Sequence, residues 1–266
     1  MPEYSLALSD PEIARYQLMA DMAEQRERGL WTAAGAVPGA RIADVGCGPG
    51  AIAARLATMA APDGAVWAVD RDRDALAVAD ALAERSGVRV HTVRGSADAT
   101  GLAPGTCDLV MLRHVLAHNG GREQEIVDHL AGLAKPGGAV YLADIDADSS
   151  RMRGVGDPAF QEMEDCYREL HRLRGNDLTV GTRLDELLTT AGLEVVAFQG
   201  HIDIVKPPPG MRGPVWAARD ALVADGLVTP ADIAHWDEAF RHAEKDGTEI
   251  RFFAAVFVAF GRRPIP

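Results

Sequence analysis

The sequence predicts an α/β protein in which a mostly parallel sheet carries helices on both faces. Between residues 41 and 144, apolar runs of strand length alternate with helical patterns, as is typical of parallel strands joined by helical crossovers. A glycine-rich turn, Asp44 to Gly50, separates the first apolar run from the first alanine-rich helical pattern. A second turn, Lys135 to Gly138, precedes the fifth apolar run and combines proline with glycine, which is a strong turn signal.

The first helix is expected to begin at Ser9 to Glu12, an S-x-x-E pattern with a proline in the first turn. It should end near Gly29, and a second short helix should cover 30–35. The expected strands are 41–45, 65–70, 89–94, 107–112, 138–144, 193–205 and 249–260. The later helices are expected at 50–60, 73–86, 121–134, 157–174, 185–191, 213–225 and 230–246.

The chain is expected to form one domain over residues 1–266, a length that a single α/β core can accommodate. Its N-terminal helical segment, about 9–35, should act as a cap. Two further segments, about 147–180 and 207–248, interrupt the alternation of strand and helix. We therefore expect them to be helical lid insertions. Closure of such lids would exclude water from a bound substrate.

Charge and composition exclude several classes of function. The formal net charge is −12, which disfavours binding to nucleic acid or to an anionic membrane surface. Apolar runs do not reach the roughly 18–20 residues of a membrane span, and the first residues have no secretory signal pattern, so a cytoplasmic protein is expected. The three scattered cysteines, Cys47, Cys107 and Cys166, match neither a zinc site nor a disulfide framework.

The glycine-rich turn predicts a site for an adenosine-containing cofactor. Glycines adopt positive φ and leave no Cβ between the backbone and a ligand. Asp70 ends the second apolar run, twenty residues after Gly50. An acid at that place in an α/β sheet suits the hydroxyls of a ribose.

The turn Asp44 to Gly50 resembles the D-x-G-x-G-x-G motif of class I S-adenosylmethionine (SAM) methyltransferases, and not the G-x-G-x-x-G motif of dinucleotide-binding proteins. Gly95 to Ala99 resembles that family's turn after the third strand, and Leu133 to Gly138 is similar to its L-x-K-P-G-G turn. The resemblance implies a Rossmann-like, seven-stranded, mostly parallel sheet with an antiparallel last strand. Ala14 to Gln17 and Arg113 to His118 more narrowly resemble small-molecule methyltransferases of ubiquinone and menaquinone biosynthesis, a group with many members in secondary metabolism.

The resemblance also implies roles for individual residues toward SAM. Asp70 would bind the ribose, and Asp98 with the Ala97 backbone would meet the adenine amine. Asp44 would orient the ammonium of the methionine part, or else would only satisfy amides of the turn; Asp98 could likewise be a turn-forming residue. Tyr16 would pack on the methionine part or in the core. The remaining residues expected to bind the cofactor are Gly46, Cys47, Gly48, Gly50, Arg71 and Arg113.

Two histidines are the candidate catalytic residues, since histidine is the usual base near neutral pH. His114 and His118 follow the fourth strand and would share a helix face if 113–118 begins a helix; either could instead cap or pack. Other side chains expected near a substrate, or else in packing contacts, are His171, His201, His235, Trp216 and Trp236.

A metal site is not expected. Asp144, Asp146 and Asp148 cluster after the fifth strand. However, Arg113 and His114 stand where a further ligand would belong, and a cation there opposes a metal ion.

These observations predict transfer of a methyl group from SAM to an oxygen, nitrogen or carbon of a small organic molecule. Two alternatives stay open: a SAM-binding relative that catalyses a non-methylating reaction such as cyclisation, and a non-catalytic SAM-binding subunit. The pattern is compatible with a monomer or a homodimer.

Overall fold

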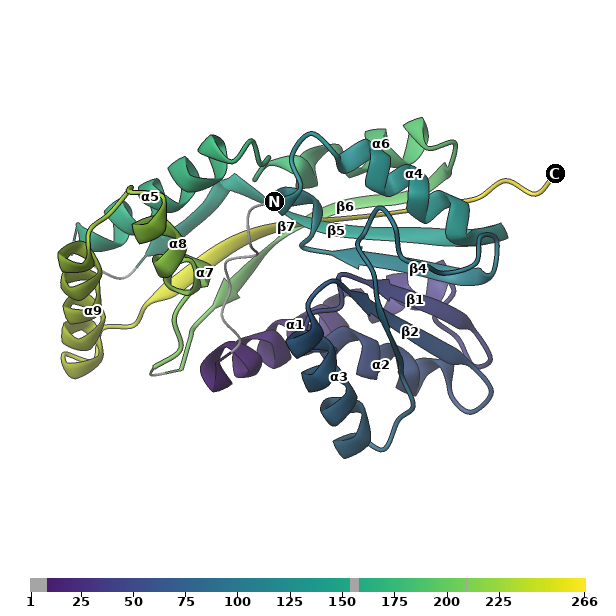
Figure 1. Ribbon diagram of the computed structural model, residues 1–266, viewed down its shortest axis with the longest axis horizontal. Coiled ribbons are helices and arrows are strands. Elements are labelled where there is room, and N and C mark those ends of the chain that lie inside the picture. The colour runs from purple at the N-terminus through teal and green to yellow at the C-terminus, as the bar shows by residue number, and fades with distance from the viewer. Residues whose placement is uncertain (1–8, 154–157, 209) are drawn as a thin grey trace.

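The computed structural model describes residues 9–153, 158–208 and 210–266 of the 266-residue chain. Seven strands form one sheet in the order β3-β2-β1-β4-β5-β7-β6 (Figure 1). The strands from β3 to β5 are parallel, and β7 is antiparallel to both of its neighbours, so the predicted Rossmann-like topology is confirmed. The strands are β1 (Arg41–Val45), β2 (Ala65–Asp70), β3 (His91–Arg94), β4 (Cys107–Arg113), β5 (Ala134–Arg153), β6 (Glu194–Val205) and β7 (Arg251–Arg262).

Helices cover both faces of the sheet, as predicted. On one face, α1 and α2 bury an apolar cluster around Trp31, Leu56 and Tyr141. On the other face, α4 and α6 bury a cluster that includes Leu130 and Leu188. The helices are α1 (Asp10–Ala34), α2 (Ala51–Ala60), α3 (Arg73–Arg85), α4 (Glu123–Leu133), α5 (Ala159–Leu173), α6 (Leu184–Thr190), α7 (Pro214–Ala217), α8 (Arg219–Ala224) and α9 (Pro230–Lys245), with short 3₁₀ turns η1 (Leu116–His118) and η2 (Val180–Arg183).

The predicted break in the first helix at Gly29 is wrong, because α1 runs without interruption to Ala34. Trp31 is fully buried on the sheet side of this helix, and that packing outweighs the weak helix propensity of one glycine. The helix ends instead at Gly35, whose φ of 123° only glycine adopts easily. The single helix predicted over 213–225 is likewise divided, at Ala218, into α7 and α8.

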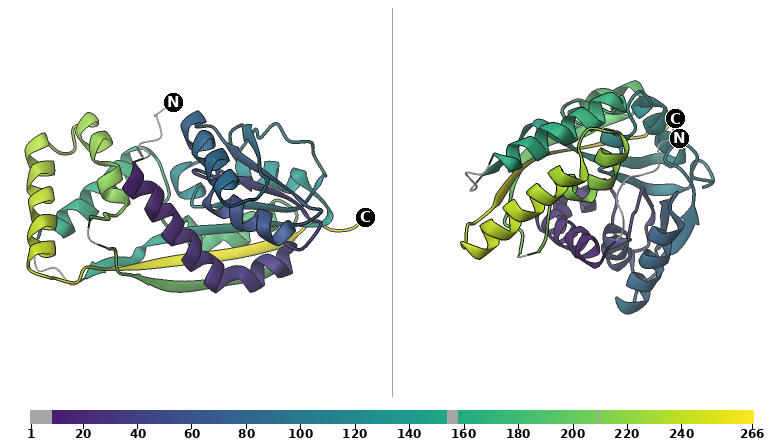
Figure 2. Two further views of the ribbon diagram at one scale, coloured as in Figure 1. Left: turned by 90° about the horizontal axis from the view of Figure 1, so that it is seen from below. Right: turned by 60° about the vertical axis from the view of Figure 1, so that its left-hand side comes forward.

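The strands β5, β6 and β7 extend well beyond the parallel part of the sheet (Figures 1 and 2). At their far end α5, α7, α8 and α9 pack together around a separate apolar core that contains Phe160, Trp236 and Phe240. We call these four helices the helical module. Both segments predicted as lids contribute to it, although residues 154–157 and 209 lie outside the described residues, as do residues 1–8, where the absence of a secretory signal was predicted.

Candidate active site

The glycine-rich turn lies in close contact with Val115, which follows β4, and with Ala79 of α3. Gly46, Gly48 and Gly50 all have positive φ, at 68°, 51° and 78°. A Cβ on Gly46 would lie 2.4 Å from Cγ2 of Val115, and a Cβ on Gly50 would lie 2.6 Å from Cβ of Ala79. At Gly48 the nearest group is the Tyr16 ring, at 3.7 Å. The turn therefore requires glycines, and the first helix places an aromatic ring over its centre.

Asp44 is buried at the end of β1, with 3% of its surface exposed. Its Oδ2 atom has no hydrogen-bond partner among the described residues. Burial raises the pKa of Asp44 to about 7, assisted by the charge of Asp70 and opposed by Arg113 and the Ala53 amide. A buried carboxylate with a free oxygen is costly alone, but it suits an ammonium group. This orphaned oxygen, beside the N-terminus of α2, fits the methionine end of SAM.

Asp70 holds the turn together from the end of β2. Its carboxylate accepts hydrogen bonds from the backbone N–H groups of Gly48 and Asp72, both at 2.9 Å. Each carboxylate oxygen has a second lone pair, so the side chain keeps acceptor capacity for ribose hydroxyls. Arg71, the next residue, is exposed and its carbonyl accepts from Arg94. Cys47 is buried within the turn, where burial raises the pKa of its thiol well above the usual value.

Asp98 lies in a small turn in which the backbones of Ser96 and Ala99 exchange hydrogen bonds. A hydrogen bond with Ser96, together with an ion pair to Arg122, holds its pKa below the usual range. Ala97 is partly buried against the apolar cluster below. Asp98 thus lies in a turn, as in the alternative role considered for it from the sequence. Binding of the adenine amine by Asp98 stays a prediction.

Arg113, at the end of β4, forms a buried ion pair with Glu27 of α1. The Tyr141 hydroxyl donates to Glu27 at 2.7 Å, and the Trp31 indole N–H donates at 3.2 Å. Burial alone would raise the pKa of Glu27, but the charge and hydrogen bonds of Arg113 hold it below the usual value. Glu27 was not singled out from the sequence, although it follows Ala20 and Ala23 and precedes Trp31 at helical spacing on the buried face of α1.

The condition under which the two histidines would share a helix face is not met, because β4 extends to Arg113 and His114 then adopts a positive φ of 55°. Only Leu116–His118 forms a 3₁₀ turn. The two histidines therefore do not share a helix face. Burial, together with the charge of Arg113, lowers the pKa of His114 to about 3, and burial with Arg71 lowers that of His118 to about 4.

The surroundings of the two histidines differ. His114 lines a pocket described below, whereas His118 packs on His171 with ring centroids 4.9 Å apart. His171 is buried beside Tyr167, and its Nδ1 lies 2.9 Å from Nδ2 of Asn176. His118 is thus part of a packed cluster, while His114 is the histidine that faces open space.

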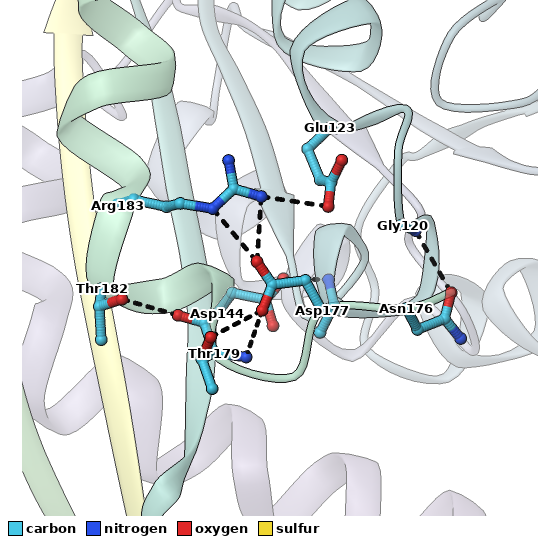
Figure 3. Close-up of polar contacts among 9 residues, drawn as sticks. Gly120, Glu123, Asp144, Asn176, Asp177, Thr179, Thr182 and Arg183 are labelled. Carbon is cyan, nitrogen blue, oxygen red and sulfur yellow. Dashed lines mark hydrogen bonds and ion pairs between the residues drawn. The ribbon is translucent and has the colours of Figure 1, made fainter. Parts of the chain in front are cut away.

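Polar contacts join the segment before α6 to the chain after β4 (Figure 3). Arg183 pairs with Asp177 and with Glu123 at the start of α4, and the Gly120 N–H donates to Asn176 Oδ1 at 3.2 Å. Asp144 accepts from the Ala117 N–H at 3.2 Å. These contacts connect the chain after β4 to β5 and to the segment before α6.

A pocket of about 260 Å³ lies between α1, the extended parts of β5, β6 and β7, and the helical module. Its walls are mainly apolar and come from all of these elements. Glu27, Arg113 and His114 also line it, which connects it to the polar network at the end of β4. Its apolar side chains include Leu18, Met19, Met22, Met152, Met211, Phe252 and Phe253.

The remaining candidates are not among the residues that line this pocket. Trp236 is fully buried in the core of the helical module, and Trp216 lies in the same module between Arg212 and Arg219. His201 is 3.6 Å from Asp203 on β6, and His235 is exposed on α9.

The acidic cluster predicted to follow the fifth strand lies within it, because β5 continues to Arg153, and its side chains have other partners. Asp144 accepts from backbone amides, and these bonds oppose the burial that raises its pKa to about 6. Asp146 accepts from the Asp148 N–H, and Asp148 pairs with Arg168. In the described ranges, no group of three or more His, Cys, Asp or Glu side chains is arranged to hold a metal ion. Nor does any helix there have the length and apolar character needed to cross a membrane.

Comparison with known proteins identifies the turn and its surroundings. A family model described as a methyltransferase domain matches residues 42–138. A Bacillus halodurans protein assigned as a methyltransferase superimposes with a TM-score of 0.60 at 20% identity, covering 90% of this chain and 99% of that protein. Residues 42–138 thus match a methyltransferase domain, and the whole chain has the fold of proteins described as methyltransferases. The domain and the fold agree with the resemblance to class I SAM methyltransferases predicted from the sequence.

Two further similarities are to proteins whose named activities differ from each other. The ubiquinone biosynthesis O-methyltransferase of Burkholderia thailandensis is 35% identical over 111 residues, which are 41% of this chain and 46% of that protein. The chain thus spans about half the length of the curated relatives it matches. The [4+2]-cyclase SpnF shares the fold with a TM-score of 0.54 at 19% identity, covering 94% of this chain and 82% of that protein.

Proposed function

We propose that this chain transfers a methyl group from SAM to a hydroxyl oxygen of a largely apolar small molecule. The observation that carries this proposal is the position of His114. Val115, the next residue, packs on Gly46 of the glycine-rich turn, and His114 itself lines the apolar pocket. One short segment therefore joins the cofactor turn to the pocket.

The residues of the turn fit SAM, which supplies an activated methyl group on a sulfonium. Asp44 would accept from the ammonium through its free Oδ2, and Asp70 would accept from the ribose hydroxyls. Tyr16 would cover the centre of the turn, as it does over Gly48. These side chains bind and orient the cofactor and keep water away from its reactive end.

His114 would act on the acceptor hydroxyl. With a pKa of about 3 it is neutral at physiological pH, so it can accept a hydrogen bond from the hydroxyl and point the oxygen lone pair at the methyl group. So weak a base does not ionise an alcohol or phenol beforehand. After methylation, however, the oxygen is a far stronger acid than the imidazolium, and the proton then passes to His114 downhill.

The pocket and the relatives support the class of acceptor. The walls are mainly apolar, although charged side chains such as Glu164, Arg168 and Arg212 line the pocket besides Glu27, Arg113 and His114. An acceptor with a largely apolar body and a polar end fits such a lining. Oxygen as the methylated atom follows the relatives named ubiquinone biosynthesis O-methyltransferases. The net charge of −12 favours a small molecule over nucleic acid, and we place the reaction in the cytoplasm.

The test is incubation with methyl-labelled SAM and a panel of apolar phenols. We expect label in the product and S-adenosylhomocysteine in equal amount. Product that forms while the label stays on SAM would favour a non-methylating reaction, as in the cyclase that shares this fold. SAM binding without any product would favour a non-catalytic subunit.

The roles of individual residues are tested by substitution at saturating SAM. His114→Ala should reduce turnover roughly 10²–10⁴-fold, whereas His118→Ala should act mainly through stability. Asp70→Ala should weaken SAM binding by about 1–3 kcal/mol, measured by calorimetry. Full turnover of His114→Ala would remove that residue from the chemistry.

A further inference from the structure

One acid stands in an apolar stretch of the pocket wall. Asp203 of β6 lines the pocket, and so do Val205 on the same strand and Ala254, the residue opposite Asp203 on β7. Residues two apart on a strand share a face, and Asp203 contacts Arg26 of α1, so this face of β6 is turned toward α1. A carboxylate among apolar side chains is costly unless something donates hydrogen bonds to it.

Neither oxygen of Asp203 accepts a hydrogen bond from the described residues. Its Oδ1 is buried and lies 2.9 Å from Nη2 of Arg26, but that contact does not have the geometry of a hydrogen bond. Its Oδ2 lies 3.6 Å from Nε2 of His201, which is beyond hydrogen-bond distance. The Arg26 side chain is 47% exposed, and an ion pair so open to solvent contributes little. Asp203 therefore has acceptor capacity that these neighbours do not use.

Several other charged side chains of the lining are engaged within the chain. Glu164 accepts from the backbone of Met152. Three of the arginines that line the pocket form hydrogen-bonded ion pairs: Arg113 with Glu27, Arg168 with Asp148 and Arg212 with Asp237. Asp203 differs from these side chains because it has a charged partner but receives no directed hydrogen bond.

Asp203 lies on a different wall of the pocket from His114. Through β5 and β7, the register of the sheet places Arg113, the residue before His114, level with Gln199 of β6. Asp203 is four residues beyond Gln199 on β6, which is about 13 Å farther along the strand. In the sheet order, β6 is also three strands away from β4. A molecule that contacts both Asp203 and His114 must therefore be elongated.

We propose that Asp203 is a specificity-determining residue that accepts a hydrogen bond from a second hydroxyl at the far end of the acceptor. The inference rests on the proposed function, in which His114 contacts the hydroxyl that is methylated. A neutral hydroxyl is favoured over an ammonium group, because Arg26 already supplies a positive charge beside Asp203. The acceptor class is then an elongated, largely apolar molecule with a hydroxyl at each end.

Two phenols that differ by one hydroxyl test this role: p-phenylphenol and p,p′-biphenol, which carries the second hydroxyl at its far end. Calorimetry with S-adenosylhomocysteine present measures both affinities without methyl transfer. Biphenol should bind the parent protein roughly 10–100-fold more tightly than phenylphenol, as expected for a hydrogen bond to a charged group. In Asp203→Ala the two affinities should be equal. Equal affinities in the parent, a preference that persists in Asp203→Ala, or no binding of either phenol would overturn the proposal.

Three further variants separate recognition from structure. Arg26→Ala removes the ion pair but should keep the preference for biphenol; if it abolished the preference as Asp203→Ala does, the pairing itself would be the cause. Asp203→Asn keeps the shape and one acceptor oxygen, so it should retain part of the preference. Glu194→Ala removes an exposed acid at the other end of β6 and should leave both affinities unchanged.

The assay with methyl-labelled SAM tests the proposed function separately. Tighter binding of biphenol without label in either phenol would contradict methyl transfer to oxygen and would leave the role of Asp203 intact. Label in both phenols at equal affinity would support the methyl transfer and would contradict the role of Asp203.

Discussion

Asp44 sits in an environment that suits its charged form poorly. The protein leaves one of its buried oxygens without a partner and raises its pKa from 3.8 to about 7. A structural role alone would favour an uncharged side chain at this place. A buried acid with a strongly shifted pKa is instead typical of a functional site.

Asp44→Asn should therefore stabilise the cofactor-free protein at pH 8. Below about pH 4 Asp44 is protonated in both the folded and the unfolded state, so no buried charge lowers the free energy of unfolding. As pH rises from about 4 to 7 only the unfolded state loses its proton, so the free energy of unfolding falls, by about 2–4 kcal/mol. Urea unfolding at pH 5 and pH 8 should show a larger gain for the variant at pH 8.

The control is Asp63→Asn, which changes an exposed loop acid and should shift stability by less than about 0.5 kcal/mol. The parent protein should also bind SAM more tightly at pH 8 than at pH 6, because ionised Asp44 accepts from the ammonium. Equal gains for Asp44→Asn at both pH values would contradict the shifted pKa.

Gly50 combines a positive φ with a close neighbour, and the two effects can be separated. Gly87→Ala changes a glycine with a φ of 67° in open space, so it should cost only about 1–2 kcal/mol for the backbone. Gly50→Ala adds a clash with Cβ of Ala79 at 2.6 Å and its Cα at 2.9 Å. It should cost about 2–5 kcal/mol in urea unfolding. Equal losses of stability for Gly50→Ala and Gly87→Ala would show that α3 moves away from the added methyl group at no cost.

At the scale of elements, α1 contacts several parts of the candidate site. Its residue Tyr16 covers Gly48, while Glu27 on the same helix pairs with Arg113 at the end of β4. Met19 and Met22, between them, line the apolar pocket. One helix thus contacts the cofactor turn, the acceptor pocket and the polar network that separates them.

Glu27→Ala should destabilise the protein by about 3–5 kcal/mol, because it leaves Arg113 buried without its counter-charge. The matched control is Glu24→Ala on the same helix. Glu24 pairs with the exposed Arg28 and with Arg55, which keeps Asp21 as a second partner, so the change should cost less than about 1 kcal/mol. Chemical unfolding measures both. If the double variant Glu27→Leu with Arg113→Met recovers much of the loss, the cause is the uncompensated charge.

At the scale of the whole molecule, the cofactor turn lies level with the middle of β5, since Val45 pairs with Leu112 and Leu112 pairs with Leu142, whereas the helical module packs at the far end of the long strands (Figure 1). The module has its own core, centred on Trp236, Phe160 and Phe240. Its stability can therefore be lowered separately from that of the sheet.

Trp236→Ala should cost about 3–5 kcal/mol within the module. Hydrogen exchange should become faster in α5 and α9 and stay unchanged in β1 and β4. SAM affinity should stay within about twofold, while binding of an apolar acceptor is lost. Faster exchange throughout the sheet would mean that module and sheet unfold as one unit; Trp236→Phe, which keeps an aromatic ring, should show much smaller effects.

Prediction from sequence succeeded where local signals decide the structure. The turn at Asp44 to Gly50 has the glycines its backbone requires, and the strands 41–45 and 65–70 lie where expected. The fifth strand differs, because β5 runs from Ala134 to Arg153 and includes Lys135 to Gly138, where a turn before a strand at 138–144 was predicted. It failed at Gly29, where burial of Trp31 outweighs propensity. It failed again at His114, because a positive φ on a non-glycine residue has no clear sequence signal.

The sequence by itself determined the α/β sheet, the glycine-rich turn and the methyltransferase-like motifs, because periodicity and glycine spacing are local properties of the chain. Only the tertiary structure decided which histidine faces the pocket, that Glu27 neutralises Arg113 from 86 residues away, and that both segments predicted as lids share one core. These depend on contacts between distant segments. Which of several similar side chains meets a partner is settled by the packing of whole elements, and that packing leaves little trace in any one stretch of sequence.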